Sequence, residues 1–267
     1  MVKPFPIFRR SIAESRRAVL GWAIGLTAFA CLYLPLFPTF GGSGSQMAQM
    51  IDALPPTLVK TLGYQDIASG AGYAQSTFFG LMGFVLTTIA AISWGAAAIA
   101  GAEETGRLEL TLAHGVSRTR QVLEASASVA VRVALLGLFA VLLVLALNGP
   151  SELELVPINV LAAGVALASV AFLTGAVALA VGAATGRHAW ATIAGAIVAI
   201  GGYATNAIAN QSADLDWLHA ISPYAWAWQE EPLESGWPLP GLSALWIACA
   251  VLVVLTAWSL NRRDLRS

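Results

Sequence analysis

Residues able to do catalytic or metal-binding chemistry are few in this chain of 267 residues, and they do not cluster. Neither lysine, Lys3 or Lys60, follows a glycine, so no GxxxxGKS/T loop is present to cradle a nucleotide phosphate. The three histidines stand apart in the sequence: His114, His188 and His219. Cys31 and Cys249 lie in apolar runs without CxxC spacing, and we expect both to be buried small side chains. The sequence therefore predicts no catalytic residue, no metal site and no cofactor bound by this chain itself.

The composition points to a lipid environment. Hydrophobic residues make up 57% of the chain and charged residues only 11%, and the mean hydropathy is +0.72. A soluble globular protein carries about 25% charged residues, so these side chains cannot supply the polar surface that a water-soluble enzyme needs. The apolar fraction also excludes intrinsic disorder. We expect the lipid bilayer, and no nucleic acid, among the partners.

Six apolar windows are long enough to cross a bilayer as helices, which takes about 20 residues each. They cover about 18–37, 77–101, 129–147, 157–182, 189–208 and 240–260. Unbroken runs of this length favour helices over a barrel, whose strands would alternate in polarity. No small-residue cleavage site follows the first window, so we expect it to be a retained span. The predicted fold is a single all-α transmembrane domain over residues 1–267.

Charge sets the orientation of these spans. Thirteen of the 14 lysines and arginines lie on the same side of the predicted topology as the two termini. Only Lys60 lies in the loops on the opposite side. The loops of that side instead hold nine acids: Asp52, Asp66, Glu152, Glu154, Asp214, Asp216, Glu230, Glu231 and Glu234. Basic residues favour the cytoplasmic side of a membrane, so the N and C termini are both predicted to be cytoplasmic.

Residues before the first span predict an amphipathic helix in the headgroup plane. Its apolar face would carry Phe5, Phe8 and Ile12. Its charged face would carry Arg10, Glu14 and Arg17. Such a helix is either a plain membrane anchor or an anchor that also touches a cytoplasmic partner.

Two long segments are predicted on the outer side. The first, about 38–76, offers short helices at Gln46–Leu54 and Thr57–Leu62, the second ending at Gly63. The other, about 209–239, is aromatic and should hold short helices at the outer interface. Its rings include Trp217, Tyr224, Trp226 and Trp228. These rings are either an interfacial belt or a surface from which a substrate is released.

The inner segment Glu103–Glu124 is the most strongly patterned part of the chain, with the sequence EETGRLELTLAHGVSRTRQVLE. Leu108 and Leu112 lie one turn apart and predict an apolar ridge on a short helix across the cytoplasmic face. Gly115 would end that helix, and Ser117 would cap the next one. A plain connector needs only a few residues, so we expect this helix to dock into a groove on another protein.

The predicted spans hold no acidic residue and one basic residue, Arg132, which we expect to snorkel toward the inner surface. Ion-driven carriers keep titratable groups at mid-membrane, so energy for transport would have to come from outside the chain. The remaining candidates for a substrate path are polar but uncharged: Thr87, Thr88, Ser93, Tyr203, Thr205 and Asn206. Ordinary hydrogen bonding between helices would explain the same residues. A path with so few polar groups suits a hydrophobic drug or lipid better than an ion or a sugar.

Several motifs together resemble the permease subunits of ABC-2 type transporters, over nearly the whole chain. Ala102-Glu103-Glu104, Gly106–Leu110 and Val116-Ser117-Arg118 are similar to the family pattern AGEE-x-GTLELLL-x-x-PVSR. The chain departs from it at Arg107 and Gly115, where threonine and proline are common. Ser222-Pro223-Tyr224 and the closing Asn261–Leu265 resemble further motifs of that family, in the same order. The stretches LPP, LGYQD and GAATGRHA look most like actinobacterial-style exporters of antibiotics and other drugs.

The resemblance implies a half-transporter of a bacterial cell membrane that moves its substrate outward. Two permeases, expected to be identical, would associate above two separate ATPase subunits, which bind ATP and Mg. Closure of the ATPases would push the helix Gly106–Arg118 and shift spans two and five around a central path. The residues implied in this coupling are Glu103, Glu104, Gly106, Arg107, Leu108, Glu109, Leu112, Gly115, Val116, Ser117 and Arg118.

Dimerisation has a weaker basis in the sequence. Gly21-x-x-x-Gly25 and Gly182-x-x-x-Gly186 would permit close helix contact, but chance also produces such spacing in a chain with 25 glycines.

Two other functions fit the same residues. A stand-alone carrier or channel would transport its substrate in vesicles that contain no ATP. A non-transporting membrane scaffold or sensor subunit would use the inner helix only to hold a partner.

Overall fold

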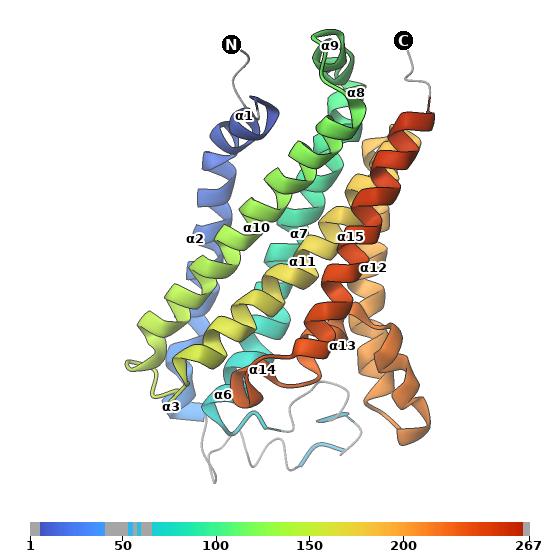
Figure 1. Ribbon diagram of the computed structural model, residues 1–267. Coiled ribbons are helices and arrows are strands. Elements are labelled where there is room, and N and C mark those ends of the chain that lie inside the picture. The colour runs from blue at the N-terminus through green and yellow to red at the C-terminus, as the bar shows by residue number, and fades with distance from the viewer. Residues whose placement is uncertain (1–5, 41–52, 56–57, 60–65, 264–267) are drawn as a thin grey trace.

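A computed structural model describes residues 6–40, 53–55, 58–59 and 66–263. Among these residues, six helical stretches are long and apolar enough to cross a membrane (Figure 1). They run over Arg16–Thr39, Gly70–Glu104, Arg118–Asn148, Pro157–Thr185, His188–Ala209 and Leu239–Arg262. The all-α class and the six predicted spans are confirmed, since every predicted window falls within one of these stretches. The chain is a multi-pass membrane protein.

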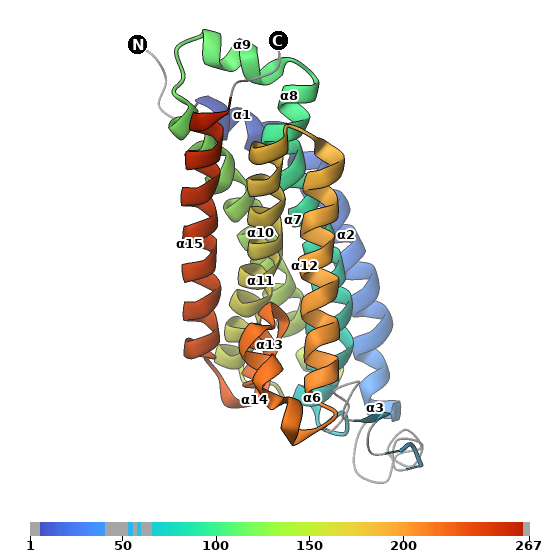
Figure 2. The same ribbon diagram turned by 90° about the vertical axis from the view of Figure 1, so that its right-hand side faces the viewer.

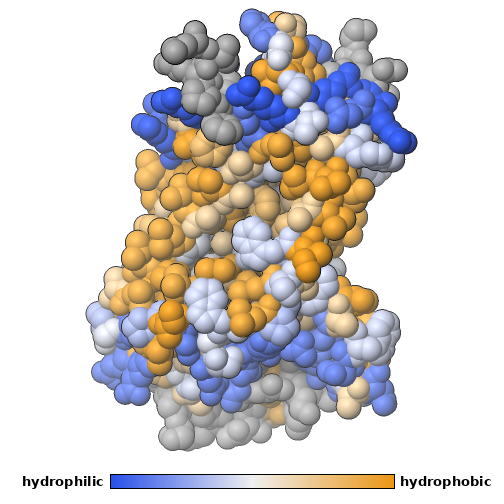
Figure 3. Space-filling model, in the orientation of Figure 1, coloured by the Kyte–Doolittle hydropathy of each residue, from blue (hydrophilic) through white to orange (hydrophobic). Residues whose placement is uncertain are grey.

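An apolar band covers the middle of the molecule, with polar surface at both ends (Figure 3). The band is built from large side chains that point away from the bundle, such as Leu20, Ile197 and Ile200. Exposing apolar surface to water costs about 25 cal/mol per Å², so a band of this kind is stable in lipid and not in water.

A short helix at one end of the molecule leads into the first span. Helix α1 (Pro6–Glu14) lies at an angle to α2 (Arg16–Tyr33), which continues through η1 (Leu34–Leu36) into α3 (Phe37–Phe40). The second span consists of α6 (Gly70–Ala74), η2 (Gln75–Gly83), α7 (Phe84–Ala96), η3 (Ala97–Gly101) and α8 (Ala102–Glu104). Because η2 and η3 are π-helical, widened turns flank its α-helical middle.

The third span, α10 (Arg118–Asn148), follows the short helix α9 (Arg107–Ala113). The Ser117 side chain accepts a hydrogen bond from the backbone N–H of Arg120 at 3.3 Å, as predicted for a cap. The remaining spans are α11 (Pro157–Thr185), α12 (His188–Ala209) and α15 (Leu239–Arg262). Between α12 and α15 lie η4 (Ala213–Ile221), α13 (Pro223–Trp228) and α14 (Pro232–Ser235).

Helix α11 forms the centre of the bundle. In its most apolar window 78% of the residues are buried, against 22% for the first, fifth and sixth spans. Small residues let its neighbours approach to backbone distance. A Cβ on Gly95 of α7 would lie 2.2 Å from the carbonyl oxygen of Gly175, and a Cβ on Gly137 of α10 would lie 2.9 Å from that of Gly164.

The two ends of the molecule differ in charge. The described ends of the chain lie at the same end as α9 (Figure 1). This inner end exposes basic side chains: Arg9, Arg10, Arg16, Arg17, Arg107 and Arg187. The opposite, outer end carries eight acids and no lysine or arginine among the described residues. The distribution agrees with the predicted topology, in which the basic end is cytoplasmic.

The prediction that Cys31 is buried was wrong. Cys31 is exposed on α2, whereas Cys249 on α15 is buried as predicted. An apolar run shows that a segment lies in the membrane, but it does not show which side of the helix meets its neighbours. The short helices expected at Gln46–Leu54 and Thr57–Leu62 lie for the most part outside the described residues, as does Gly63.

Candidate functional site

The segment between the second and third spans folds as predicted into a short helix, α9, which crosses the inner end of the molecule (Figure 2). Gly106 (φ 67°) precedes α9 and Gly115 (φ 82°) follows it. Both angles lie in the left-handed region, which glycine adopts without strain. The two glycines therefore allow the chain to turn out of the second span and back into the third.

The apolar ridge of α9 faces its own chain, so the ridge is not the face that would dock, and docking of α9 into a partner stays a prediction. Leu108 is completely buried, and the partly buried Leu112 packs against the same core. On the other face Leu110 is 63% exposed, and Ala113 and His114 are exposed beside it. The exposed face of α9, which we define as Leu110, Ala113 and His114, is thus the one that a partner can reach. Helical spacing identifies an apolar face but does not distinguish a contact within the chain from a contact with another protein.

Glu103 connects the inner ends of several spans. Its carboxylate forms an ion pair with Arg263, just after α15, and the Glu103 side chain is only 6% exposed. The turn between α11 and α12 passes directly beside this pair, since a Cβ on Gly186 would lie 2.6 Å from Glu103 Oε1. The neighbouring Glu104 accepts a hydrogen bond at 2.8 Å from the backbone N–H of His188, the first residue of α12.

Arg118 holds the other end of the same segment to α15. Its Nη1 donates to the carbonyl oxygens of Leu260, at 2.7 Å, and Arg263, at 2.5 Å. The last carbonyls of a helix lack partners within it and carry partial negative charge, so a guanidinium is stabilising there. We call the Glu103–Arg263 pair and these two hydrogen bonds of Arg118 the inner clamp. Glu103 and Arg118 belong to the predicted coupling residues, whereas no local spacing in the sequence indicates their common partner, Arg263.

A side chain from the third span caps helix α1. Glu124 Oε2 accepts hydrogen bonds from the backbone N–H groups of Ile7, at 2.9 Å, and Phe8, at 3.0 Å. Its other oxygen accepts from Arg120 Nε at 2.7 Å. The first N–H groups of a helix have no acceptor within it, so this buried carboxylate both satisfies them and complements their partial positive charge. The predicted helix is present, with Phe5 outside the described residues, but its cap was missed because Ile7 and Glu124 are 117 positions apart.

Arg132 is buried instead of snorkelling, which corrects a second prediction. It is 5% exposed, and its Nη1 and Nη2 donate to the hydroxyls of Ser15 and Ser128, both at 2.9 Å. Its Nε donates to the Ser128 carbonyl oxygen at 2.8 Å, and its guanidinium carbon lies 4.9 Å from the centre of the Trp94 ring. Such a cation–π contact is strengthened by desolvation. Arg132 thereby fastens the junction of α1 and α2 to both the second and the third span.

Three of the six polar residues predicted for a substrate path form hydrogen bonds to backbone carbonyls of the second span. Thr87 and Thr88 are buried, and their hydroxyls donate to the carbonyl oxygens of Gly83, at 2.7 Å, and Phe84, at 2.6 Å. Ser93 donates to Ala90 O at 2.8 Å. The half-buried residues of α12 in this set are Tyr203, Thr205 and Asn206. A role of the whole set in a path stays a prediction.

The outer aromatic residues fall into two groups. Tyr224 on α13 donates its hydroxyl to Gly80 O at 2.8 Å, and its ring packs edge-on against Phe84, with centroids 5.1 Å apart. Burial raises the pKa of this phenol above its ordinary value. Trp228 is also buried, so α13 is held inside the outer end of the bundle.

Trp217 and Trp226 line a cavity of about 440 Å³. It lies between η4, α13 and the first turns of α15, and we call it the outer cavity. Its polar lining comes from Asp216, His219, Gln229 and Glu230. Trp217 and Trp226 reach this cavity while Trp228 is buried, and both interpretations of the aromatic set, an interfacial belt or a release surface, stay predictions.

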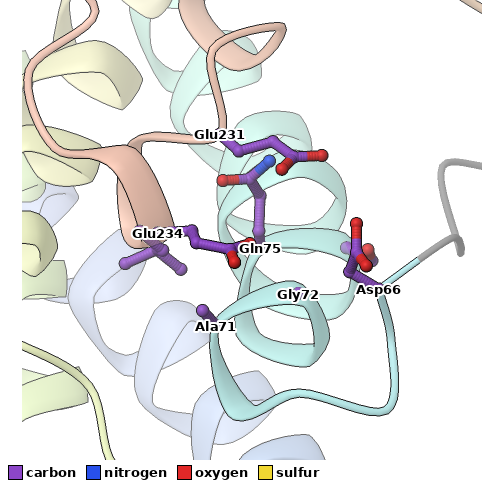
Figure 4. A pocket seen from close by; sticks show the side chains of 8 residues that line it. Asp66, Ala71, Gly72, Gln75, Glu231 and Glu234 are labelled. Atoms are coloured by element: carbon purple, nitrogen blue, oxygen red, sulfur yellow. The ribbon is translucent and has the colours of Figure 1, made fainter.

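Three acids meet elsewhere at the outer end, around Gln75 (Figure 4). The carboxylate oxygens of Asp66, Glu231 and Glu234 lie within 4.8 Å of one another, and this group is one that could hold a hard cation. Burial, followed by the charges of Asp66 and Glu234, raises the pKa of Glu231. No ligand spacing in the sequence indicates this group, because Asp66 lies far from the other two along the chain.

The chain matches one family model, described as the C-terminal domain of the multidrug efflux system permease Rv1217c, over residues 11–260. A comparison with curated proteins gave no match. The matched residues include all of α9, the outer cavity and nearly all of the six spans. Because this match extends from within α1 into the last turns of α15, the chain belongs to this family of multidrug efflux permeases.

Proposed function

We propose that the chain is the membrane subunit of an ATP-driven exporter of the ABC-2 type. It would act as a homodimer with two separate ATPase subunits at its inner end, and those subunits would bind ATP and Mg. The substrate would be a hydrophobic drug, antibiotic or lipid, moved outward across a bacterial cell membrane. Membership of a multidrug efflux permease family supports the drug-exporting part of this proposal.

The inner clamp is the observation that carries the ATP-driven part. A force applied to the exposed face of α9 would be transmitted to the second span through α8 and to the sixth through Glu103 and Arg118. Glu104 would transmit it to the start of α12 through the backbone of His188. The Glu103–Arg263 pair is largely shielded from solvent and so is screened less than an exposed pair, which would keep the segment attached to α15 during such a displacement.

Copurification with an ABC-type ATPase, if the neighbouring reading frame encodes one, would test the proposal. We expect Leu110→Asp and Ala113→Asp to weaken the complex by at least about tenfold, because each places a charge in a contact that must be desolvated. Ala13→Asp is the matched control, since Ala13 is exposed on α1 at the same end of the molecule. It should leave the complex unchanged.

Transport assays in vesicles would complete the test. ATP-dependent export of a drug by the complex, lost in the Leu110→Asp variant and kept in Ala13→Asp, is the expected result. Equal transport without ATP by the permease alone would instead favour a carrier. An assembled complex without any flux would favour a scaffold.

A further inference from the structure

The outer cavity has fixed walls. The Trp226 indole N–H donates to Ala220 O at 2.9 Å, and Ser222 caps α13 by accepting from the Ala225 N–H at 3.1 Å. A Cβ on Gly241 would lie 1.8 Å from Trp226 O, so α15 touches the backbone of α13 at this point. These contacts hold the walls of the cavity in place, which lowers the entropic cost of binding a ligand there.

Carboxylates outnumber basic side chains in the lining of the cavity. Asp216 and Glu230 contribute carboxylates to its lining. The Asp216 carboxylate lies 3.0 Å from His219 Nδ1, while Glu230 has no ion pair among the described residues. The part of the outer end that the structure describes has no lysine or arginine to offset these charges. An anionic ligand is disfavoured here, and a cationic one is attracted.

The remaining walls are aromatic and apolar. Trp217, which is 63% exposed, and Trp226 of α13 both line the cavity, with Ala225 and Ala244 also in the lining. Tryptophan is the aromatic side chain that attracts cations most strongly, and it also binds the apolar body of a ligand. A volume of about 440 Å³ falls in the range of small-molecule sites, and is larger than a hydrated metal ion requires.

We propose that the outer cavity binds a lipophilic organic cation, a ligand with one positive charge spread over an apolar body. The assignment of such cations as exported substrates rests on the proposed function, but their binding to the cavity does not. Carboxylates would supply the attraction to charge, and tryptophan rings would supply the contact with the apolar groups.

Two probes of nearly equal shape and opposite charge test this proposal. Equilibrium binding of tetraphenylphosphonium and of tetraphenylborate is measured on the purified full-length permease in detergent, without ATPase and without ATP, with empty micelles as the blank. We expect the phosphonium to bind at least about tenfold more tightly, which corresponds to about 1.4 kcal/mol. Equal binding of the two ions would overturn the proposal.

Variants locate the site. Glu230→Gln, and the double variant Asp216→Asn with Glu230→Gln, should weaken phosphonium binding about threefold and tenfold, because charge attraction at a partly exposed site is modest. Trp217→Leu should weaken it, while Trp217→Phe should keep part of the affinity. The control is the double variant Glu152→Gln with Glu154→Gln, which removes two exposed outer acids that do not line the cavity.

If affinity for the phosphonium falls equally in the control and in the cavity variants, the proposal is overturned. It is also overturned if Glu230→Gln and Trp217→Leu both bind the phosphonium as tightly as the parent. Helicity and thermal midpoint are measured for each variant, and Glu230→Gln is the informative one if the double variant is unstable. Binding that is intact in a permease that never supports ATP-dependent export would count against the proposed function and leave the cavity assignment standing.

Discussion

The guanidinium of Arg132, in the middle of the third span, donates a 2.9 Å hydrogen bond to the hydroxyl of Ser15, where α1 meets α2. The two residues are 117 positions apart, yet this contact and the cap that Glu124 places on α1 join the same two helices. Helix α1 is therefore part of the packed bundle at its inner end.

Removing this arginine should destabilise the fold. We expect Arg132→Met to lower the free energy of unfolding by about 1.5–3 kcal/mol, the usual worth of hydrogen bonds to a charged group. Arg132→Lys should lower the free energy of unfolding by a smaller amount, because lysine keeps the positive charge. Some loss should remain, because lysine lacks the planar guanidinium that reaches both serines. Thermal unfolding in detergent measures the change. Arg17→Met, at an exposed position on α2, should stay within about 0.5 kcal/mol of the parent, and an equal effect of both substitutions would contradict the assignment.

A double-mutant cycle should detect the ion pair of the inner clamp. We expect Glu103→Gln and Arg263→Gln to show a coupling energy of about 1–3 kcal/mol, because the two side chains are only 6% and 20% exposed. The Arg10–Glu14 pair on α1, with side chains 74% and 57% exposed, is the reference. Its coupling should be about 0.3–0.5 kcal/mol. Similar coupling energies for the two pairs would show that the Glu103–Arg263 ion pair is worth no more than an ion pair at the surface.

Substituting two glycines that share a backbone angle would distinguish the cost of backbone strain from the cost of steric contact with neighbouring side chains. Gly106 and Gly186 both have φ 67°, but a Cβ on Gly106 meets nothing within 4 Å, whereas a Cβ on Gly186 meets the Glu103–Arg263 pair. We expect Gly106→Ala to cost about 1–2 kcal/mol from the left-handed conformation alone. Gly186→Ala should cost more than that and should also weaken the coupling between Glu103 and Arg263. Equal free energies of unfolding for the two variants would contradict the close contact between Gly186 and the Glu103–Arg263 pair.

The acidic group at the outer end should make stability depend on pH. The pKa of Glu231 is raised in the folded chain by burial and by the neighbouring carboxylates of Asp66 and Glu234. A carboxyl whose pKa is higher in the folded state than in the unfolded state costs stability when charged, and this cost disappears as pH falls through the raised pKa. Glu231→Gln should therefore raise the thermal midpoint at pH 7, and the gain should vanish near pH 4, about the ordinary value for glutamate. An unchanged thermal midpoint of Glu231→Gln at pH 7 would contradict this expectation.

Much of this architecture can be predicted from the sequence, because lipid imposes a simple requirement on each span. Runs of apolar residues such as 157–182 place the helices, and the one-sided arginines place the inner end. Local capping is also readable, as Ser117 illustrates. These features depend on residues close together in the chain, where spacing translates directly into geometry.

Contacts between distant segments could not be predicted in this way. The spacing of Leu108 and Leu112 gives a helix with an apolar face, but only tertiary packing turns that face inward and leaves Leu110 exposed. Arg132 offers the same lesson, since a lone arginine in an apolar run is consistent with snorkelling until its partner Ser15 is placed. The outer cavity likewise depends on α13 folding back between spans, which no periodicity in residues 209–239 indicates.

The contact between Gly95 and Gly175 has a mechanical consequence. Main chain meets main chain there, so no side chain is available to swing aside and accommodate sliding. If the proposed ATPases displace the inner end, α7 and α11 would either move together as a pair or separate at this contact. This contact would then be the point about which the two helices turn. A bulkier residue at Gly95 or Gly175 would push the helices apart and hinder that movement.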